Sequence, residues 1–343
     1  MIEKQTKNAK NDDLATSTTT SFPKKTGLEK SNFISLSNSC CDTTARTLEW
    51  KNLYKTETRF KKFTHKDSIK HPAKMSFGLL DKIFEHLEET DLTSDTVIVD
   101  FMAGTGRTGL VAALSGYKSI MVELEDEYIK MQKKNIKVLE QRIGKTDIRV
   151  MKGDARNLAM LLRNQVITPK VGIISPPYED AEIPQIDDNL REALHTDKGK
   201  RTIDEMKKKR AELRESGEWE GYNRSDNRNI GNLKEKEYED AMTEIYSEAK
   251  SIGISPLVVV TKNPTRKGKL VDVASITAHA LERAGYTIYD YHRARLFDTK
   301  TTKTSKLFPR SQKKTQGRVS FFKRLSMEKG NVAAEWEDII FAR

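Results

Sequence analysis

The chain has 343 residues, of which 36% are hydrophobic and 32% charged, and its formal net charge is +11 at pH 7. This length is enough for one large domain or two small ones with a sizeable core. No apolar run approaches the ~20 residues that a membrane-spanning helix needs. The first residues lack the apolar segment of a signal peptide, and the two cysteines are adjacent, at Cys40 and Cys41. We therefore expect a cytoplasmic protein with no disulfide framework and no membrane contact.

The positive charge is concentrated in two segments, residues 51–74 and 299–324. The second segment contains nine lysines and arginines and no acidic residue. Such clusters attract phosphates and supply the salt-dependent part of nucleic-acid binding. A solvated, lysine-rich face explains the charge equally well, so only neighbouring motifs can decide between the two interpretations.

Along the chain, a polar tail precedes a long region of alternating strands and helices. Residues 1–45 are rich in Ser, Thr, Lys and Asn without a hydrophobic period, which predicts disorder. Residues 46–343 predict an α/β domain, a doubly wound, mostly parallel sheet with helices on both faces. Within it, residues 179–232 are dense in mixed charge and predict an insertion or a lid, with one helix near 203–213. The remaining predicted helices are 77–89, 108–114, 126–142, 234–251 and 271–284, and the predicted strands are 97–100, 119–123, 148–151, 171–175, 257–261, 287–292, 318–323 and 338–341.

A proline motif, Ser175–Tyr178 (SPPY), ends the short apolar strand at 171–174. Each proline fixes φ near −65° and removes an N–H, so the carbonyls of Ser175 and Pro176 have no ladder to join. A rigid carbonyl, a hydroxyl and the ring of Tyr178 then lie at the carboxyl end of a strand, where open α/β sheets bind ligands. This arrangement suits a flat base that carries an amine. It also fits a strand-ending turn with an exposed tyrosine.

A glycine-rich turn, Asp100–Gly106 (DFMAGTG), joins the first predicted strand to a helix. Its glycines let the backbone approach a ligand and leave room for the start of the helix. The next strand ends at Glu123, spaced to receive ribose hydroxyls, and the third ends at Asp154, where an acid can accept from the amine of an adenine. The turn also satisfies the dinucleotide pattern through Gly109, and each of these features taken singly fits an ordinary turn.

In this order the motifs resemble the S-adenosylmethionine-dependent methyltransferases that modify exocyclic amines of DNA bases. The resemblance covers about residues 65–343 and extends to Asn229–Asn232, which leads to Tyr238. It implies a Rossmann-like class I methyltransferase fold, and SPPY is the variant most often associated with N4 of cytosine. The family commonly has Asp-Pro-Phe where this chain has Asp100-Phe-Met, and no large separate target-recognition domain is evident.

The resemblance also implies roles for the matched residues, with S-adenosylmethionine as cofactor. The Ser175 hydroxyl and the Pro176 carbonyl would accept the hydrogens of the amine and direct its lone pair at the methyl group, so that positioning supplies much of the rate. The histidines show no metal-binding spacing, and we expect no metal site. His71 and Lys74 also fit polar residues that precede a helix. The implied catalytic residues are Ser175, Pro176, Pro177 and Tyr178, and the implied cofactor-binding residues are His71, Lys74, Met75, Asp100, Met102, Ala103, Gly104, Gly106, Glu123 and Asp154.

These implications predict a site-specific DNA methyltransferase acting on N4 of cytosine. The expected partner is double-stranded DNA whose target base is flipped out, at a cost of roughly a few kcal/mol that stacking on Tyr178 partly offsets. Residues 179–232 and a basic loop at 299–318 are the candidate DNA contacts, and a restriction endonuclease of the same site is a candidate partner. The alternatives are an N6-adenine enzyme, an RNA amine methyltransferase, a catalytically inactive nucleic-acid-binding protein and, from the glycine pattern alone, a dinucleotide-dependent dehydrogenase. Neither the target sequence nor the oligomeric state can be read from the chain.

Overall fold

The computed structural model describes residues 48–51, 53, 57–66, 68, 75–163, 170–177, 228–266, 269–303, 311–317 and 334–343. Four predictions lie outside these residues: the tail at 1–45, the helix near 203–213, the strand at 318–323 and all but the end of the charged insertion. No helix in the described ranges is both long and apolar enough to cross a membrane.

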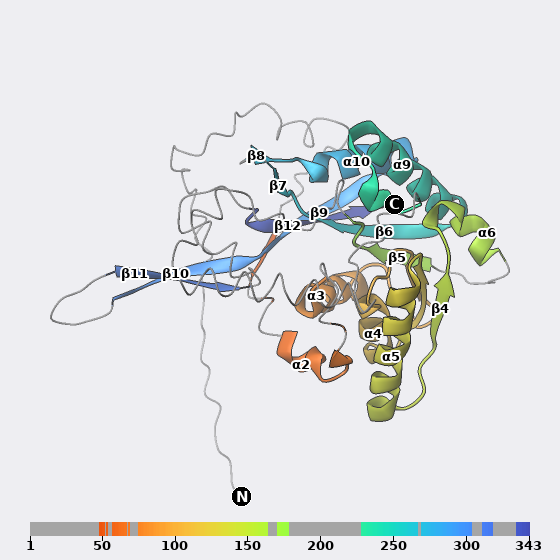
Figure 1. Cartoon of the computed structure of the whole chain (residues 1–343), viewed down its shortest axis with the longest axis horizontal. Helices are drawn as coiled ribbons and strands as arrows, with labels where there is room; N and C mark the ends of the chain where they lie inside the picture. Colours follow the sequence, from red (N-terminus) through yellow and green to blue (C-terminus); the bar gives the residue numbers. More distant parts are fainter. Residues whose placement is uncertain are drawn as a thin grey trace, which may run out of the picture. The chain divides into compact units, whose positions relative to one another are not determined.

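The order of the strands in the main sheet defines the fold (Figure 1). In the described part of the chain, eight strands form one sheet in the order β1-β9-β12-β6-β5-β2-β3-β4. β12 is antiparallel to both of its neighbours, β6 and β9, and the five other pairings are parallel. The strands are β1 (Leu48–Trp50), β2 (Val97–Asp100), β3 (Lys118–Glu123), β4 (Ile148–Lys152), β5 (Lys170–Ile174), β6 (Ile254–Thr261), β9 (Ile288–Arg295) and β12 (Trp336–Ala342).

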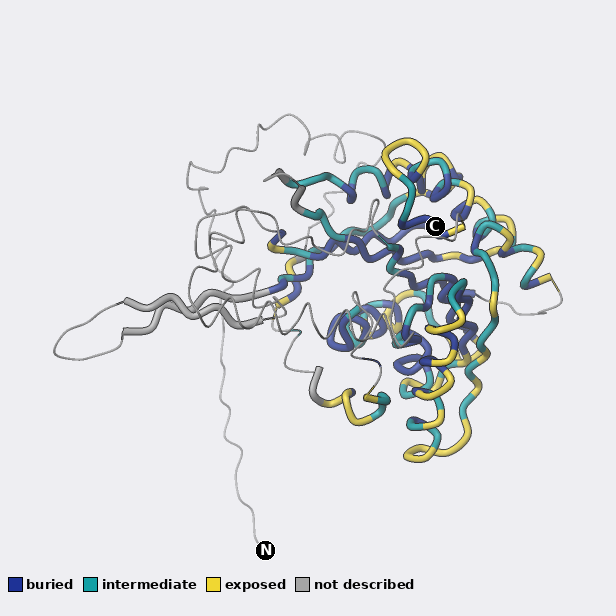
Figure 2. The backbone as a smooth tube through the Cα atoms, in the orientation of Figure 1, coloured by how far each residue is buried: buried dark blue, intermediate teal, exposed yellow. Residues whose placement is uncertain are grey.

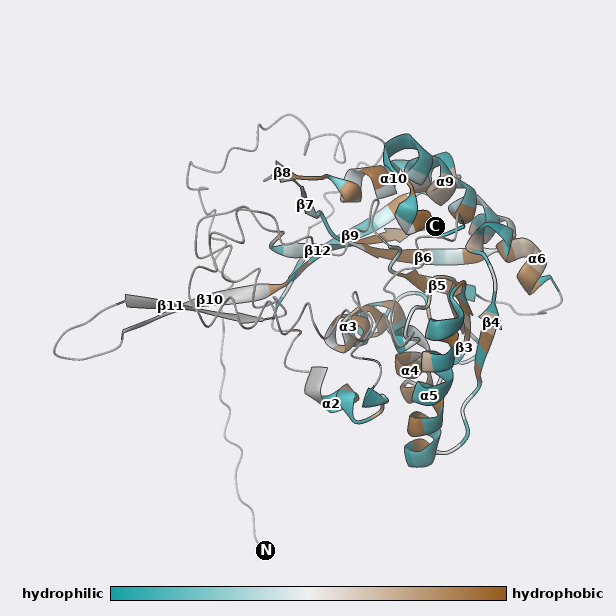
Figure 3. Ribbon diagram, viewed as in Figure 1, coloured by the Kyte–Doolittle hydropathy of each residue, from teal (hydrophilic) through white to brown (hydrophobic). Residues whose placement is uncertain are grey.

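Helices cover both faces of this sheet, which explains why its central strands are apolar throughout. One face packs against α3 (Phe77–Glu88), α4 (Arg107–Leu114) and α5 (Asp126–Ile143). The other packs against α6 (Leu158–Leu162), α9 (Glu235–Ser251) and α10 (Val273–Arg283). Figure 2 shows the buried strands between the two helical layers, and Figure 3 shows the hydrophilic sides of α5 and α9.

The predicted fold class is confirmed by this topology. Parallel strands extend to both sides of β2, and a last strand is inserted antiparallel between β6 and β9, which is the arrangement of the Rossmann-like class I methyltransferase fold. The predicted elements in the described ranges are present, with ends shifted by a few residues. The described elements that the sequence did not predict are β1, α2 (Glu57–Lys61), α6, β7 (Thr265–Arg266), β8 (Lys269–Leu270), β10 (Phe297–Lys303), β11 (Ser311–Gly317) and the short helices η3 (Ala155–Asn157) and η4 (Ile230–Asn232).

One prediction about the basic segment needs correction, because residues 299–318 are not simply a loop. β10 (Phe297–Lys303) pairs antiparallel with β11 (Ser311–Gly317) over seven residue pairs. β10 contains three threonines and β11 one, and β-branched residues favour extended backbone even where lysines interrupt them. The density of lysine concealed this pattern in the sequence.

Candidate functional site

The glycine-rich turn and the proline motif lie beside each other because they follow neighbouring strands. β2 ends at Asp100 and β5 ends at Ile174, and the two strands pair in parallel. The chain continues from β2 to β3 on one side, while β5 lies on the other side. Their carboxyl ends therefore flank the topological switch point, which is where open α/β sheets bind ligands.

The glycine-rich turn has a backbone that needs glycine, and helix α5 holds it in place. Gly104 and Gly106 have φ of 49° and 77°, values that side chains other than glycine rarely adopt. A Cβ on Gly106 would lie 3.0 Å from both Gln132 and Met121. The amide of Gln132 donates to the carbonyl of Gly104 at 2.8 Å, so the turn is fixed before any ligand arrives.

The carboxylate of Glu123 is joined directly to this turn. Its Oε2 accepts from the N–H of Gly104 at 2.7 Å, and its Oε1 accepts from the N–H groups of Leu124 and Glu125 at 2.8 and 3.0 Å. Burial raises the pKa of Glu123 to about 7, although these backbone hydrogen bonds lower it. The predicted ribose-binding acid therefore lies at the end of β3, beside the glycine-rich turn.

Asp100 shows the same effect at the end of β2. The side chain is buried, and its Oδ1 accepts from the N–H of Met102 at 3.1 Å. Burial raises the pKa of Asp100 to about 6, against the hydrogen bonds from Thr108 and Met102. Two carboxyl groups that titrate near neutral pH thus lie at neighbouring strand ends, and such perturbed acids are typical of functional sites.

The third predicted acid, Asp154, forms a salt bridge with Arg156. It caps η3, and both of its carboxylate oxygens accept from the guanidinium of Arg156, at 2.7 to 3.2 Å. Arg156 also donates to the carbonyl of Arg228 at 3.2 Å, and Asn229 donates to Glu125 at 3.0 Å. The segment that begins at Arg228 thus lies against the ends of β3 and β4. Contact of Asp154 with an adenine stays a prediction.

The proline motif is fixed from α9. Pro176 is buried, Ser175 and Pro177 are half-buried, and Tyr178 lies outside the described residues. The hydroxyl of the buried Tyr238 donates to the carbonyl of Pro177 at 2.9 Å. The sequence pattern includes Tyr238 but gave no reason to connect it with the prolines.

The segment before α3 reaches the glycine-rich turn through an arginine. Arg107, the first residue of α4, donates to the carbonyl of Met75 at 2.9 Å, and its guanidinium lies 4.2 Å from the ring centre of Phe77. Met75 therefore lies beside the start of α4, directly after the glycine-rich turn. Its contact with a cofactor stays a prediction. His71 and Lys74 lie outside the described residues.

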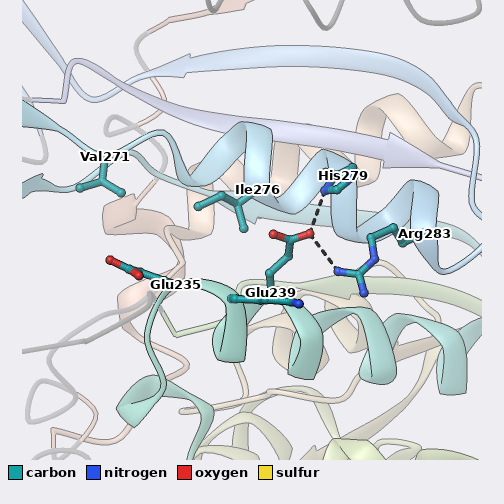
Figure 4. Close-up of a pocket in the computed structure, with 7 residues that line it drawn as sticks. Glu235, Glu239, Val271, Ile276, His279 and Arg283 are labelled. Carbon is teal, nitrogen blue, oxygen red and sulfur yellow. Dashed lines mark hydrogen bonds and ion pairs between the residues drawn. The ribbon is translucent and has the colours of Figure 1, made fainter.

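A separate hollow of about 800 Å³ lies between α9 and α10 (Figure 4). In it, Glu239 accepts from Arg283 at 2.9 Å and pairs with His279 at 2.8 Å. None of the predicted site residues lines this hollow, so we do not place the chemistry there. Its lining residues are Glu235, Lys236, Glu239, Val271, Ile276, His279 and Arg283.

The fold and the strand-end site together define a methyltransferase of the class I type. Residues 2–134 match the family model described as DNA methylase, and this match confirms the predicted resemblance to DNA amino-methyltransferases. Residues 79–242 match a second family, described as conserved hypothetical protein 95. No curated protein sequence matches the chain.

Solved structures similar to this chain are distant from it. A precorrin 8w decarboxylase from Methanobacterium thermoautotrophicum is 12% identical with a TM-score of 0.39, the match covering 79% of this chain and 92% of that one. A magnesium protoporphyrin IX methyltransferase from Synechocystis, solved with bound SAH, is 10% identical with a TM-score of 0.38, covering 84% and 95%. TrmN from Thermus thermophilus is 11% identical with a TM-score of 0.38, covering 84% of this chain and 52% of that one. At these scores the fold assignment rests on the strand order above.

Proposed function

We propose that this chain transfers a methyl group from S-adenosylmethionine to the exocyclic N4 of cytosine in DNA. The observation that carries the proposal is the position of Ser175, Pro176 and Pro177 at the end of β5, next to the glycine-rich turn at the switch point. A site that binds a nucleoside-like cofactor on one side and a flat amine on the other needs both features at one sheet edge.

The residues present fit S-adenosylmethionine, which supplies an electrophilic methyl group when bound. Glu123 would accept from the ribose hydroxyls, since its carboxylate is already oriented by the N–H groups of Gly104, Leu124 and Glu125. Asp100 would hold the amino-acid end, on the same turn as Met102 and Ala103. The chain's part in the reaction is to bind and orient, because methyl transfer is a direct in-line displacement.

The amine would be oriented by two acceptors on the proline motif. The lone pair of an exocyclic amine is delocalised into the ring, which makes the nitrogen a poor nucleophile. Hydrogen bonds from the NH₂ group to Ser175 Oγ and to the Pro176 carbonyl favour a pyramidal nitrogen, whose lone pair can then face the methyl group. The hydrogen bond from the Tyr238 hydroxyl to the Pro177 carbonyl restrains the proline motif in this geometry.

DNA is the proposed partner, with the target base flipped out of the duplex to reach Ser175. The basic strands β10 and β11 and the charged segment at 179–232 are the proposed contacts. Lysines and arginines at these positions would neutralise phosphates and make binding fall steeply with salt. Methylation of N6 of adenine is the second candidate, because the matching family is described only as DNA methylase and adenine also carries an exocyclic amine.

Transfer of label from S-adenosylmethionine tests the proposal. The full chain is incubated with tritiated cofactor and with duplex DNA or RNA of mixed sequence, and the product nucleosides are separated. We expect label in N4-methylcytosine from DNA, and at least a tenfold lower rate for Ser175→Ala. Ser247→Ala, which alters an exposed hydroxyl on α9, should leave the rate unchanged. Label in N6-methyladenine or in RNA would show that the substrate is adenine or RNA instead of cytosine in DNA. No transfer despite cofactor binding would refute the activity.

A further inference from the structure

Two histidines and an aspartate meet at a place that the methyl-transfer site does not use. His86 is in the last turn of α3, whereas Asp290 and His292 are on β9. The Nε2 atoms of the two histidines lie 2.9 and 3.0 Å from the same oxygen, Oδ2 of Asp290. One ligand atom from each residue falls within 4.8 Å of the others.

The fold explains why these side chains converge. Residues two apart on a strand point to the same face, so Asp290 and His292 both face the helical layer that contains α3. β9 runs parallel to β6, since β12 is antiparallel to both. Through β12 and β6, Asp290 is in register with Ile173 of β5, and His292 is level with the residue after Ile174. The cluster therefore lies level with the carboxyl end of β5 but three strands away from it. The cluster shares no residue with the methyl-transfer site, so the inference does not rest on the proposed function.

The cluster is oriented by its surroundings. The second oxygen of Asp290, Oδ1, accepts from the N–H of Tyr291 at 2.8 Å, and this bond directs Oδ2 at the imidazoles. The ring of Trp50 stacks on His292 with centroids 4.7 Å apart, and Phe341 lies edge-on to both histidines. An apolar shell and an oriented carboxylate are what protein metal sites have around their ligands.

Hydrogen bonds among the described residues do not satisfy every buried polar atom of this cluster. His292 is 1% exposed, and its Nδ1 has no hydrogen-bond partner among the described residues. Both imidazoles contact the same carboxylate oxygen, Oδ2 of Asp290. The side chains of His86 and Asp290 are 20% and 24% exposed, so solutes can reach the open side of the cluster.

We propose that His86, Asp290 and His292 bind a divalent transition metal, with Zn²⁺ as the probe. Two imidazoles and one carboxylate are a ligand set that zinc accepts, with solvent in the fourth position. Around a tetrahedral zinc the ligand atoms would be about 3.3 Å apart, so binding draws the two imidazoles together. The partly exposed His86, at the end of its helix, can supply that movement. The metal would cross-link α3 to β9, three strands away from the proline motif after β5.

Zinc titration of the metal-stripped full chain tests this site. Both cysteines are first replaced (Cys40→Ser and Cys41→Ser) to remove thiol ligands. We expect one equivalent of Zn²⁺ to bind by calorimetry with a dissociation constant of about 10 µM or lower, and the melting temperature to rise with Zn²⁺ but not with Mg²⁺. His86→Gln should weaken binding at least tenfold, while His86→Glu, which keeps a ligand atom, should retain part of the affinity.

The matched control is His279→Gln. His279 also pairs with a carboxylate, Glu239 at 2.8 Å, but no second imidazole from the described part of the chain joins that pair. Its substitution should leave zinc binding unchanged. Absence of zinc binding by the cysteine-free chain would overturn the proposal. So would equal binding by the cysteine-free parent and its His86→Gln variant, because the metal would then be held elsewhere.

Discussion

The hydroxyl of Tyr238 donates a 2.9 Å hydrogen bond to the carbonyl oxygen of Pro177. Tyr238 lies near the start of α9, 61 residues beyond the proline, and its side chain is buried. Since prolines have no N–H, the turn after β5 cannot be held by an ordinary ladder of backbone hydrogen bonds. The helix that packs beneath the strand end therefore supplies the restraint that the motif itself lacks.

We predict that Tyr238→Phe lowers kcat about fivefold and leaves the KM for S-adenosylmethionine unchanged. A buried hydrogen bond of this kind contributes about 1 kcal/mol, and its loss lets the Pro176–Pro177 unit move relative to the amine. Tyr246→Phe is the matched control, because Tyr246 is buried on the same helix and its hydroxyl has no hydrogen-bond partner among the described residues. An equal fall in kcat in both variants would show that the effect is a general loss of packing.

Local patterns predicted the elements of the fold, because each carries its signals within a few residues. The helix after Met75 was predicted at 77–89 from its apolar stripe, and it occupies Phe77–Glu88, with Ser76 capping its first turn through the N–H of Leu79. β1 was not predicted, since three residues are too few for a period. It exists because Leu48–Trp50 pairs with β9, more than 200 positions away.

In the candidate site, too, the local features could be predicted from the sequence and the long-range contacts could not. Glycines and strand-end acids could be located from the sequence, because each belongs to a turn of fixed form. Contacts between distant segments could not, and these hold the site together. The restraint of Pro177 by Tyr238, the hydrogen bond from Arg156 to the carbonyl of Arg228, and the meeting of His86 with His292 all depend on packing that no short pattern encodes.

Replacing Gly106 tests the backbone requirement of the glycine-rich turn. We predict that Gly106→Ala costs about 1–2 kcal/mol of unfolding free energy from its positive φ, and further energy from contact with Gln132 and Met121 at 3.0 Å. Gly116→Ala is the control, since Gly116 has φ of 85° and no atom within 4 Å of its would-be Cβ. Both variants should lose stability in urea unfolding, but only Gly106→Ala should also weaken cofactor binding. Unimpaired binding by Gly106→Ala would remove this turn from the site.

Asn135 provides a test of how α5 supports the site. Its Nδ2 donates to the carbonyl of Thr105 at 2.8 Å, and its Oδ1 accepts from His65 N and Ser68 Oγ at 2.8 and 2.7 Å. Asn135→Asp places a second acceptor against the Thr105 carbonyl in a buried position, so we predict a loss of about 2–4 kcal/mol in urea unfolding. Asn157→Asp, at an exposed position, should change stability by less than about 0.5 kcal/mol. Comparable losses in both would contradict the proposed role of the buried amide.

The raised pKa of Glu123 predicts that cofactor affinity depends on pH. Only the ionised carboxylate can accept from both ribose hydroxyls, and with a pKa of about 7 the ionised fraction rises from about one-tenth at pH 6 to about nine-tenths at pH 8. Affinity for S-adenosylmethionine, measured by calorimetry, should therefore increase up to about tenfold over this range and level off above it. Because the pKa of Asp100 is about 6, protonation of this carboxylate should lower the affinity further as the pH falls through 6.

The raised pKa of Glu123 increases cofactor affinity as the pH rises, but it lowers the stability of the cofactor-free chain over the same change in pH. A carboxyl group whose pKa rises from 4.5 to about 7 on folding favours the folded state at low pH. That contribution is complete below pH 4.5 and is lost as the pH rises through 7.

Glu123→Gln should abolish the pH dependence of cofactor affinity between pH 7 and 8, and it should flatten the stability profile between pH 4.5 and 7. Glu140→Gln, at the far end of α5, should keep both dependences. If Glu123→Gln binds the cofactor with the same pH profile as the unaltered chain, another group is responsible and the ribose assignment is wrong.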